Sequence, residues 1–190
     1  MKVPVLITAL CLSLCLTACG NQEAPEASQQ VQSSASETAG ILSQFAAQDL
    51  QGDSINQEIF QGHKLTMVNV WATFCTPCIN EMPDLGELSQ EYSDKGVQIV
   101  GMVSDAMASD GSIDKEQVAL AQEIVDSTAA NYTHILPGED LYGLLYQITS
   151  VPTTFFVDEE GNQVGNTYLG AKDKEAWKAI IDQLLEEVEK

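Results

Sequence analysis

The sequence predicts an α/β domain in which helices flank a central mixed β-sheet, preceded by a leader and a tether. Three observations lead to this fold class. Strand and helix patterns alternate over residues 65–136. A hairpin pattern and a long amphipathic helix follow at 153–190. Residues 20–40 contain almost nothing apolar, so they cannot join a core. The expected order of elements after the tether is βββαβαβαββα.

The first 18 residues have the features of an export signal. Lys2 precedes an apolar run over 3–16, which has the length of a signal-peptide core and is too short to span a bilayer. The run ends in Leu-Thr-Ala-Cys at Cys19, which resembles the bacterial lipobox, where cleavage before the Cys is followed by attachment of a diacylglycerol to its sulfur. We predict a lipoprotein signal peptide over 1–18 and lipidation of Cys19. The alternative is an ordinary secretory signal cut near Ala18.

Residues 19–40 are predicted to form the lipidated Cys and a disordered tether, with one domain over 41–190. A flexible chain of this length has a root-mean-square span of roughly 25 Å. The whole chain carries 28 Asp and Glu against 8 Lys and Arg, a net charge of −20. Such a chain lacks the basic surface that nucleic acid or anionic lipid would need. We therefore expect no nucleic-acid partner, and membrane attachment through the lipid alone.

The strands are predicted from apolar patterns and turn signals. Residues 45–50 and 54–59 read as two short strands joined by a turn. Residues 65–71 and 97–103 are nearly continuous apolar runs, as in buried strands, and the handedness of crossovers favours their parallel pairing. A helix is expected from the CTPC motif to about residue 92, with a kink at Pro83. The remaining elements are a loop at 104–113, a helix at 114–130, a strand at 132–136, a short helix at 139–147, hairpin strands at 153–158 and 163–170, and a closing helix at 173–190.

The motif Cys75-Thr-Pro-Cys78 lies where a buried strand meets the following helix. Pro77 suits the first turn of a helix. Cys75 at the helix N-terminus is expected to have a depressed pKa and a reactive thiolate, while Cys78, one turn further in, is more buried. Two cysteines so placed can have Cα atoms about 5–6 Å apart and close a disulfide. We predict a dithiol–disulfide switch in which Cys75 attacks and Cys78 resolves the mixed disulfide.

Three other interpretations of the motif have less support. A zinc site needs about two more ligands, and only His63 and His134 are available, without paired spacing; both are expected on the surface or in loops, with no role. A structural disulfide closing so small a loop removes little unfolded-state entropy. A peroxidatic cysteine typically follows Pro-x-x-x-Thr-x-x, but Val68 and Ala72 stand at those places before Cys75.

Three segments together resemble the thioredoxin superfamily. They are Asn69-Val-Trp-Ala-Thr-Phe-Cys-Thr-Pro-Cys78, Ile79-Asn-Glu-Met-Pro83 and Val151-Pro-Thr-Thr-Phe-Phe-Val157. More narrowly, they are similar to the TlpA/ResA-like extracytoplasmic thiol-disulfide oxidoreductases, from about residue 45 to the C-terminus. The resemblance implies a thioredoxin fold with an extra N-terminal β-hairpin at 45–62.

The resemblance also implies roles for single residues. Pro152 would be the cis-proline that faces the disulfide, and the Val151 backbone would pair with an extended substrate segment. Glu81 would act in proton transfer or tune the thiol pKa values; the alternative is a solvated helix residue. Asn69 stands where cytoplasmic thioredoxins have a buried Asp. Trp71 is expected to pack beneath the site.

Residues beside the cysteines are predicted to contact the substrate. Phe74 replaces the Trp that is usual before the first Cys, which keeps an aromatic rim but removes an indole N–H donor. Thr76 and Pro77, between the cysteines, tune the redox poise. With Val151 they make up the expected substrate-binding set.

The function that the resemblance implies is an envelope-anchored oxidoreductase that reduces disulfides or sulfenic acids of exported proteins. It needs no cofactor beyond the Cys75–Cys78 disulfide, and no metal. The expected partners are protein clients, such as apocytochrome c during cytochrome c maturation or a methionine sulfoxide reductase, and a membrane electron donor. Two alternatives stay open: a disulfide-forming oxidase of the same fold, and a non-catalytic surface lipoprotein.

Overall fold

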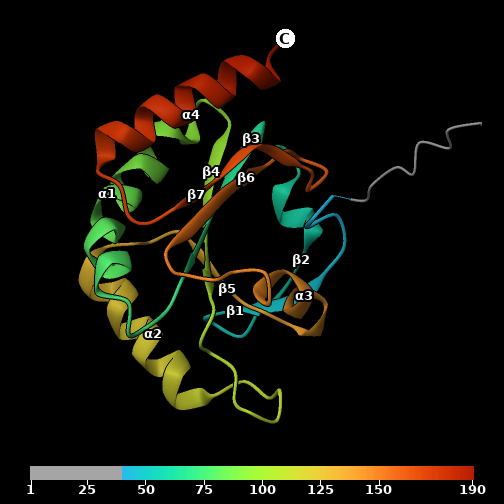
Figure 1. The fold of residues 1–190 in the computed structure, drawn as a ribbon, viewed down its shortest axis with the longest axis vertical. Coiled ribbons are helices and arrows are strands. Elements are labelled where there is room, and N and C mark those ends of the chain that lie inside the picture. Colours follow the sequence, from blue (N-terminus) through green and yellow to red (C-terminus); the bar gives the residue numbers. More distant parts are fainter. Residues whose placement is uncertain (1–39) are drawn as a thin grey trace, which may run out of the picture. The chain divides into compact units, whose positions relative to one another are not determined.

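The computed structural model describes residues 40–190, in which one mixed seven-stranded sheet forms the centre of the fold (Figure 1). The predicted signal peptide, Cys19 and nearly all of the tether lie outside the described residues. The strands are ordered β2-β1-β5-β4-β3-β6-β7. Their bounds are β1 Ala46–Asp49, β2 Ser54–Asn56, β3 Leu65–Trp71, β4 Val97–Val103, β5 Thr133–Leu136, β6 Thr153–Val157 and β7 Gln163–Leu169.

Helices cover both faces of this sheet. In Figure 1, α1, α2 and α4 lie on one side of the sheet and α3 lies on the other. None of the helices in the described part of the chain is long and apolar enough to cross a bilayer. The helices are α1 Thr76–Ser93, α2 Lys115–Thr128, α3 Tyr142–Leu145 and α4 Lys174–Val188, with short 3-10 helices at Gln57–Phe60 (η1) and Glu139–Leu141 (η2).

Strand β3 occupies the interior of the sheet and carries the site at its carboxyl end. It pairs in parallel with β4, from Leu65 opposite Val97 to Trp71 opposite Val103, so the predicted parallel pairing is confirmed. On its other side it pairs antiparallel with β6. All seven β3 residues are buried, which explains the continuous apolar run in the sequence.

The core is divided by the sheet into two sides. On one side of the sheet, Val68 and Val70 pack against side chains of η1, η2 and the segment before β1. Met67 packs on the other side against side chains of α1 and α4, including Trp177. Burying both faces of a sheet requires helices on each, which is why strand and helix patterns alternate along the chain.

The placement of His134 differs from the prediction. His134 is 3 % exposed and lies within β5, so the prediction of a surface or loop position was wrong. Its ring occupies the space beside Gly101 on the neighbouring strand, where an added Cβ would lie 2.1 Å from Nδ1. The glycine in β4 therefore makes room for a buried histidine, a relation between strands that the local sequence does not show.

The structure differs in detail from the expected strand over 54–59, and it shows where Pro83 lies in the helix after the cysteines. β2 ends at Asn56, whose side chain accepts a hydrogen bond from the Glu58 N–H and caps η1, so the expected strand over 54–59 becomes a strand and a 3-10 turn. β2 pairs antiparallel with β1, and β1 pairs antiparallel with β5. Pro83 lies inside one continuous helix over Thr76–Ser93.

Candidate active site

The two motif cysteines sit where β3 passes into α1. Cys75 is the N-cap of α1, with Pro77 in the first turn. Its Sγ accepts a hydrogen bond from the Cys78 N–H at 3.2 Å. The two sulfurs form a disulfide, with Cα atoms 5.3 Å apart. Because the helix N-terminus offers N–H groups and a positive dipole end, the same position favours a negatively charged sulfur when the disulfide is open.

The exposure of the residues around the disulfide is uneven. Cys78 is fully buried and Cys75 is 5 % exposed, whereas Phe74 is 76 % exposed. Thr76 and Pro77 are also exposed. The disulfide therefore lies closest to solvent at Cys75, beside the exposed Phe74 and the two exposed residues between the cysteines.

The Val151–Pro152 peptide bond is cis, and Pro152 is buried directly before β6. Since Thr153 pairs with Val70 near the end of β3, this proline lies at the same edge of the sheet as the cysteines. Val151 packs against the buried cluster that contains both of them. The structure thus brings together Cys75, Cys78, Val151 and Pro152.

Glu81 lies one turn after Cys78 on α1 and is only 3 % exposed. Its carboxylate accepts three hydrogen bonds: from Asn69 Nδ2 at 2.9 Å, from the Lys172 N–H at 3.1 Å and from Trp177 Nε1 at 3.3 Å. Burial raises the pKa of Glu81 above its ordinary value, and these hydrogen bonds oppose part of that rise. A solvated helix position, the alternative considered for Glu81, is therefore wrong.

Trp71 packs in the same buried cluster as the two cysteines. Its Nε1–H donates to His134 Nδ1 at 3.2 Å, and His134 Nε2 lies 3.0 Å from the Ala130 carbonyl. Nε2 therefore carries the proton of a neutral ring. Burial lowers the pKa of His134 to about 4, so the ring stays uncharged at neutral pH.

Sequence reasoning missed Asp105, which lies in the loop just after the carboxyl end of β4. Its carboxylate accepts hydrogen bonds from the Thr73 N–H at 3.0 Å and from Thr73 Oγ1 at 2.6 Å, and Gln117 Nε2 adds a longer contact of 3.4 Å. These bonds fix the turn that leads into Cys75. Polar residues just past the carboxyl ends of parallel strands commonly line a site, and that rule points to Asp105.

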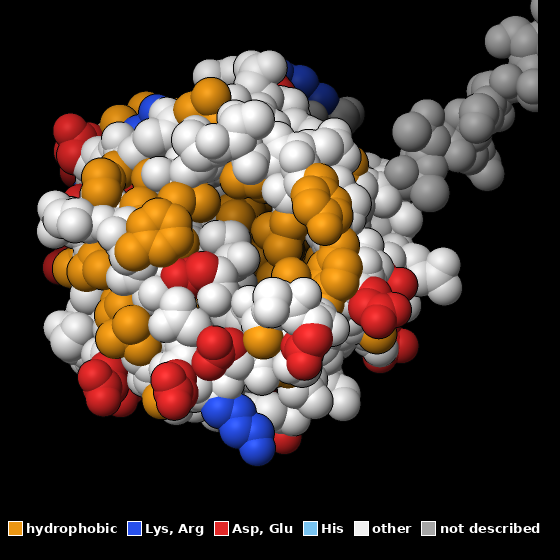
Figure 2. Space-filling view, turned by 60° about the horizontal axis from the view of Figure 1, so that its bottom comes forward, with side chains coloured by type: hydrophobic (Ala, Val, Ile, Leu, Met, Phe, Trp, Pro, Cys, Tyr) orange, Lys and Arg blue, Asp and Glu red, His pale blue; other side chains and the backbone are white. Residues whose placement is uncertain are grey.

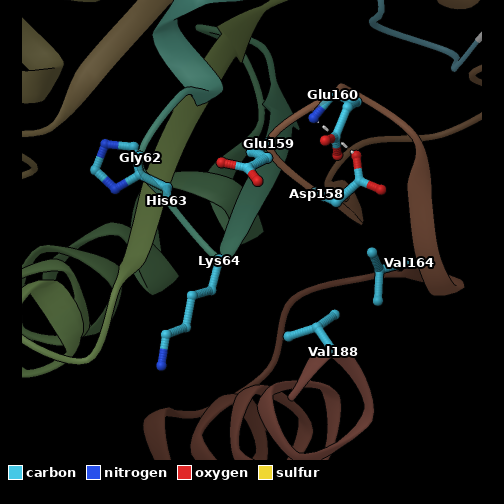
Figure 3. Close-up of a pocket in the computed structure, with 8 residues that line it drawn as sticks. All are labelled: Gly62, His63, Lys64, Asp158, Glu159, Glu160, Val164 and Val188. Atoms are coloured by element: carbon cyan, nitrogen blue, oxygen red, sulfur yellow. Dashed lines mark hydrogen bonds between the residues drawn. The ribbon is translucent and has the colours of Figure 1, made fainter. Parts of the chain in front are cut away.

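No group of three or more His, Cys, Asp or Glu side chains among residues 40–190 is arranged to hold a metal ion. A hollow of about 490 Å³ lies at the opposite end of β3, next to Lys64 and the acidic turn at 158–160 (Figure 3). In that turn the Asp158 carboxylate accepts a hydrogen bond from the Glu160 N–H, so it serves the turn itself. This hollow contains neither cysteine, and we assign the chemistry to the carboxyl end of β3.

The fold and the paired cysteines define the class of this protein as a thioredoxin-like thiol-disulfide oxidoreductase. The chain belongs to the Redoxin family, whose model matches residues 21–185. It is 27% identical over 140 residues to a thiol-disulfide oxidoreductase ResA of Bacillus cereus, with 74% of each chain covered.

Solved structures agree on the fold. The dsbF protein of MTB superposes with a TM-score of 0.60 at 23% identity, covering 77% of this chain and 99% of that one. A secreted Mycobacterium tuberculosis disulfide oxidoreductase, described as homologous to E. coli DsbE, gives a TM-score of 0.57 at 20% identity, covering 74% and 96%. These likenesses, with the family match, establish the predicted thioredoxin fold.

Proposed function

We propose that this chain is held outside the cytoplasm by a lipid on Cys19 and reduces disulfides or sulfenic acids of exported client proteins. The observation that carries the redox part is the position of Cys75: an N-cap sulfur next to the exposed Phe74, bonded to a fully buried Cys78. The lipobox-like sequence before Cys19 and the secreted structural neighbour support the extracytoplasmic location.

The proposed reduction has two exchange steps. The Cys75 thiolate attacks one sulfur of a client disulfide, forming a mixed disulfide and releasing the other client sulfur as a thiolate. With a client sulfenic acid, the same attack forms the mixed disulfide and the oxygen leaves as water after taking up a proton. The Cys78 thiolate then attacks Cys75 Sγ, closes the Cys75–Cys78 disulfide and releases the reduced client. Two electrons pass to the client, and a membrane dithiol donor restores them.

The surrounding residues are proposed to act around these steps. Glu81, as a carboxylate, accepts the proton of the Cys78 thiol before the second step. The Val151 backbone pairs with an extended client segment beside Pro152. Phe74, Thr76 and Pro77 contact the client, consistent with their exposure at the rim. Apocytochrome c and an exported methionine sulfoxide reductase are the client classes that the family resemblance suggests.

Trapping tests the direction and the clients together. A Cys78→Ser chain lacks the resolving sulfur, so clients should accumulate as mixed disulfides on Cys75, and the Cys75→Ser, Cys78→Ser double variant is the matched control. The alternative outcome is that client cysteines form disulfides in cells with the wild-type chain but stay reduced in cells with the Cys78→Ser chain. That outcome would indicate a disulfide-forming oxidase. A Cys75→Ser chain with an unchanged cellular phenotype would indicate a non-catalytic lipoprotein.

The anchor needs its own test, because the trapping experiment does not report on it. Changing Cys19 to Ser removes the acceptor sulfur for the diacylglycerol. We expect the chain to move from the membrane fraction to the soluble extracytoplasmic fraction, while purified protein keeps its rate of disulfide reduction. Retention of the Cys19→Ser chain at the membrane would refute lipid anchoring at this residue.

A further inference from the structure

An open groove leads away from the redox site between the loop after β4 and α3. It consists of two adjoining hollows, of about 520 and 550 Å³, that share Ser104 and Leu145. The first hollow borders Phe74 and Val151, and so begins at the rim of the disulfide. The face turned forward in Figure 2 shows apolar side chains gathered around a hollow, with acidic side chains along its lower rim. We call the two hollows together the client groove; the second is lined by Met107, Ala108, Ser109, Asp110, Gly111, Tyr142 and Tyr146 besides the shared pair.

The walls of the client groove are tied together by hydrogen bonds. Tyr142 of α3 donates through its hydroxyl to the Gly111 carbonyl at 3.1 Å, which links one wall to the other. Within the loop, Met107 and Ile113 form an antiparallel bridge, and the Ala108 N–H donates to the Ser112 carbonyl at 2.8 Å. A groove formed before its partner arrives costs little ordering on binding.

The client groove presents aromatic surface to solvent. Tyr146 is 88 % exposed and Phe74 is 76 % exposed, which makes them the two most exposed large apolar residues of the described part of the chain. Single exposed apolar residues are ordinary, but these two line the two adjoining hollows of one groove, which begins beside the redox site. Apolar surface arranged in this way indicates a partner.

The charge of the client groove selects the kind of partner. Among the described residues that line it, Asp110 is the one charged side chain. Its carboxylate accepts hydrogen bonds from the Ser112 N–H at 3.0 Å and Ser112 Oγ at 2.6 Å, which keep it ionised. Lys64, Lys174 and Lys178 form ion pairs with glutamates on or near α1 and α4, outside the groove. With a net charge of −20, the chain repels a second copy of itself and attracts a cationic segment.

We propose that the client groove binds an extended client segment that carries an aromatic or aliphatic residue and a lysine or arginine beside its oxidised cysteine. The apolar side chain packs on Leu145 and Tyr146, and the cation lies at Asp110. This inference rests on the proposed function, because the client cysteine must reach Cys75. It names the sequence chemistry by which the oxidoreductase would choose among oxidised proteins.

Peptide disulfides provide the test. Each peptide has one Cys capped by 2-mercaptoethanol, and three matched versions carry Phe and Lys, Phe and Glu, or Ser and Lys near that Cys. We expect the reduced full chain to react with the Phe/Lys peptide about tenfold faster than with the Phe/Glu peptide at low salt, and the ratio to shrink as salt is added. The Ser/Lys peptide should react about fivefold more slowly than the Phe/Lys peptide.

Variants assign the effect to the client groove. Asp110→Asn should remove the preference for Lys over Glu, and Tyr146→Ser should remove the preference for Phe over Ser. The matched control is Glu160→Gln, an exposed acid at the opposite end of β3, which should change neither ratio (Figure 3). Equal rates for all three peptides, or ratios that survive both groove variants, would overturn the inference.

The rate of reduction of a small neutral disulfide tests the proposed oxidoreductase function independently of the client groove. Bis(2-hydroxyethyl) disulfide has neither side chain, so the wild type and the groove variants should reduce it at the same rate. If the wild type reduces it but does not discriminate among the peptides, the groove inference fails and the oxidoreductase stands. If the wild type fails to reduce it, the proposed function itself fails. Sedimentation of a dimer that Tyr146→Ser dissociates would show a second copy in the groove and would refute a client segment there.

Discussion

Glu81 is a buried carboxyl group that can change its charge near the resolving cysteine. Burial raises its pKa, so its carboxylate form is lost as the pH falls through that raised value. If the carboxylate takes the Cys78 proton, the release of client must slow over the same pH range. The effect of Glu81 on stability has the opposite pH dependence to its effect on client release. Because its pKa is higher in the folded state, Glu81 stabilises the fold at pH values below its unfolded-state pKa. This stabilisation is lost as the pH rises through its folded-state pKa.

We expect Glu81→Gln to slow the resolution of a preformed mixed disulfide by about 100-fold and to flatten its dependence on pH. Rapid-mixing measurements of client release across the acidic range provide the readout. Asp84→Asn is the matched control on the same helix, because Asp84 accepts the Lys174 N–H at 3.0 Å and has no bond to the Glu81 network. A Glu81→Gln chain that keeps the wild-type pH limb would show that Glu81 does not handle this proton.

His134 makes the folded state sensitive to acid. Its pKa is lowered from 6.5 to about 4 by burial, so folding favours the neutral ring. A depressed folded-state pKa contributes stability that is present above the unfolded value of 6.5 and is lost as the pH falls towards 4. The loss expected from this ring is about 2 kcal/mol by about pH 5 and about 3 kcal/mol by about pH 4.

The comparison that isolates this effect is His134→Gln. A glutamine amide can accept from Trp71 Nε1 and donate to the Ala130 carbonyl, but it does not titrate. Urea unfolding at neutral and acidic pH should therefore show a steeper loss of unfolding free energy in the wild type than in His134→Gln. The difference of the two slopes removes the titration of the many carboxyl groups that both chains share. Parallel pH profiles would refute the assignment.

At the residue scale, the sequence predicted the cysteine pair, Glu81 and Pro152 because each belongs to a short motif. The buried position of His134 and the contacts of Asp105 were not predicted. Their hydrogen-bond partners, Trp71 and Thr73, lie on other segments of the chain and become neighbours only when the sheet forms. No local pattern distinguishes a histidine buried against another strand from one in a loop. The roles of the motif residues stay predictions that the trapping and pH experiments test.

The backbone conformation at the end of helix α2 is a feature that the local sequence does not predict. The C-cap of helix α2 is Ala129, which is exposed and has φ 53° and ψ 28°, a conformation that glycine adopts far more easily. We expect Ala129→Gly to raise the free energy of unfolding by about 1 kcal/mol, because it removes the steric cost of a left-handed Cβ. Urea unfolding of the reduced and oxidised proteins measures the change.

A glycine placed elsewhere in the same helix provides the control. Ala119 is exposed in the interior of α2, where glycine is a poor helix former, so Ala119→Gly should lower the free energy of unfolding by about 1 kcal/mol. Opposite signs for the same chemical change would assign the Ala129 effect to the helix end. Destabilisation by both substitutions would contradict the argument.

At the element scale, long patterns predicted structure well and short ones did not. The buried strands β3 and β4 and the amphipathic helix α4 were evident from runs of apolar residues with a clear period. The region around α3 was harder, because the expected helix over 139–147 consists of a 3-10 turn and a single helical turn. Segments of this length are decided by contacts with the sheet rather than by their own periodicity.

The charge of the whole molecule adds a property that no single element has. The full chain has a net charge of −20. Its acidic side chains repel one another, and this repulsion is stronger in the compact folded state than in the unfolded chain. The ion pairs of the half-buried Lys174 with the exposed Glu87 and Glu91 lie at the surface and relieve only part of this repulsion. Because salt screens repulsion among many acids more than it weakens a few surface pairs, the folded state should gain from added salt.

We expect the free energy of unfolding to rise by about 1 kcal/mol between low salt and about 0.5 M sodium chloride, a range over which the screening length falls from tens of ångströms to a few. Potassium chloride should give the same rise if screening is the cause, since the two salts differ in their cation alone. The double variant Glu159→Lys, Glu160→Lys lowers the negative charge at the turn remote from the cysteines and should reduce the salt dependence. If the free energy of unfolding of the wild type is constant or falls with added salt, repulsion among the acidic side chains does not limit the stability of this fold.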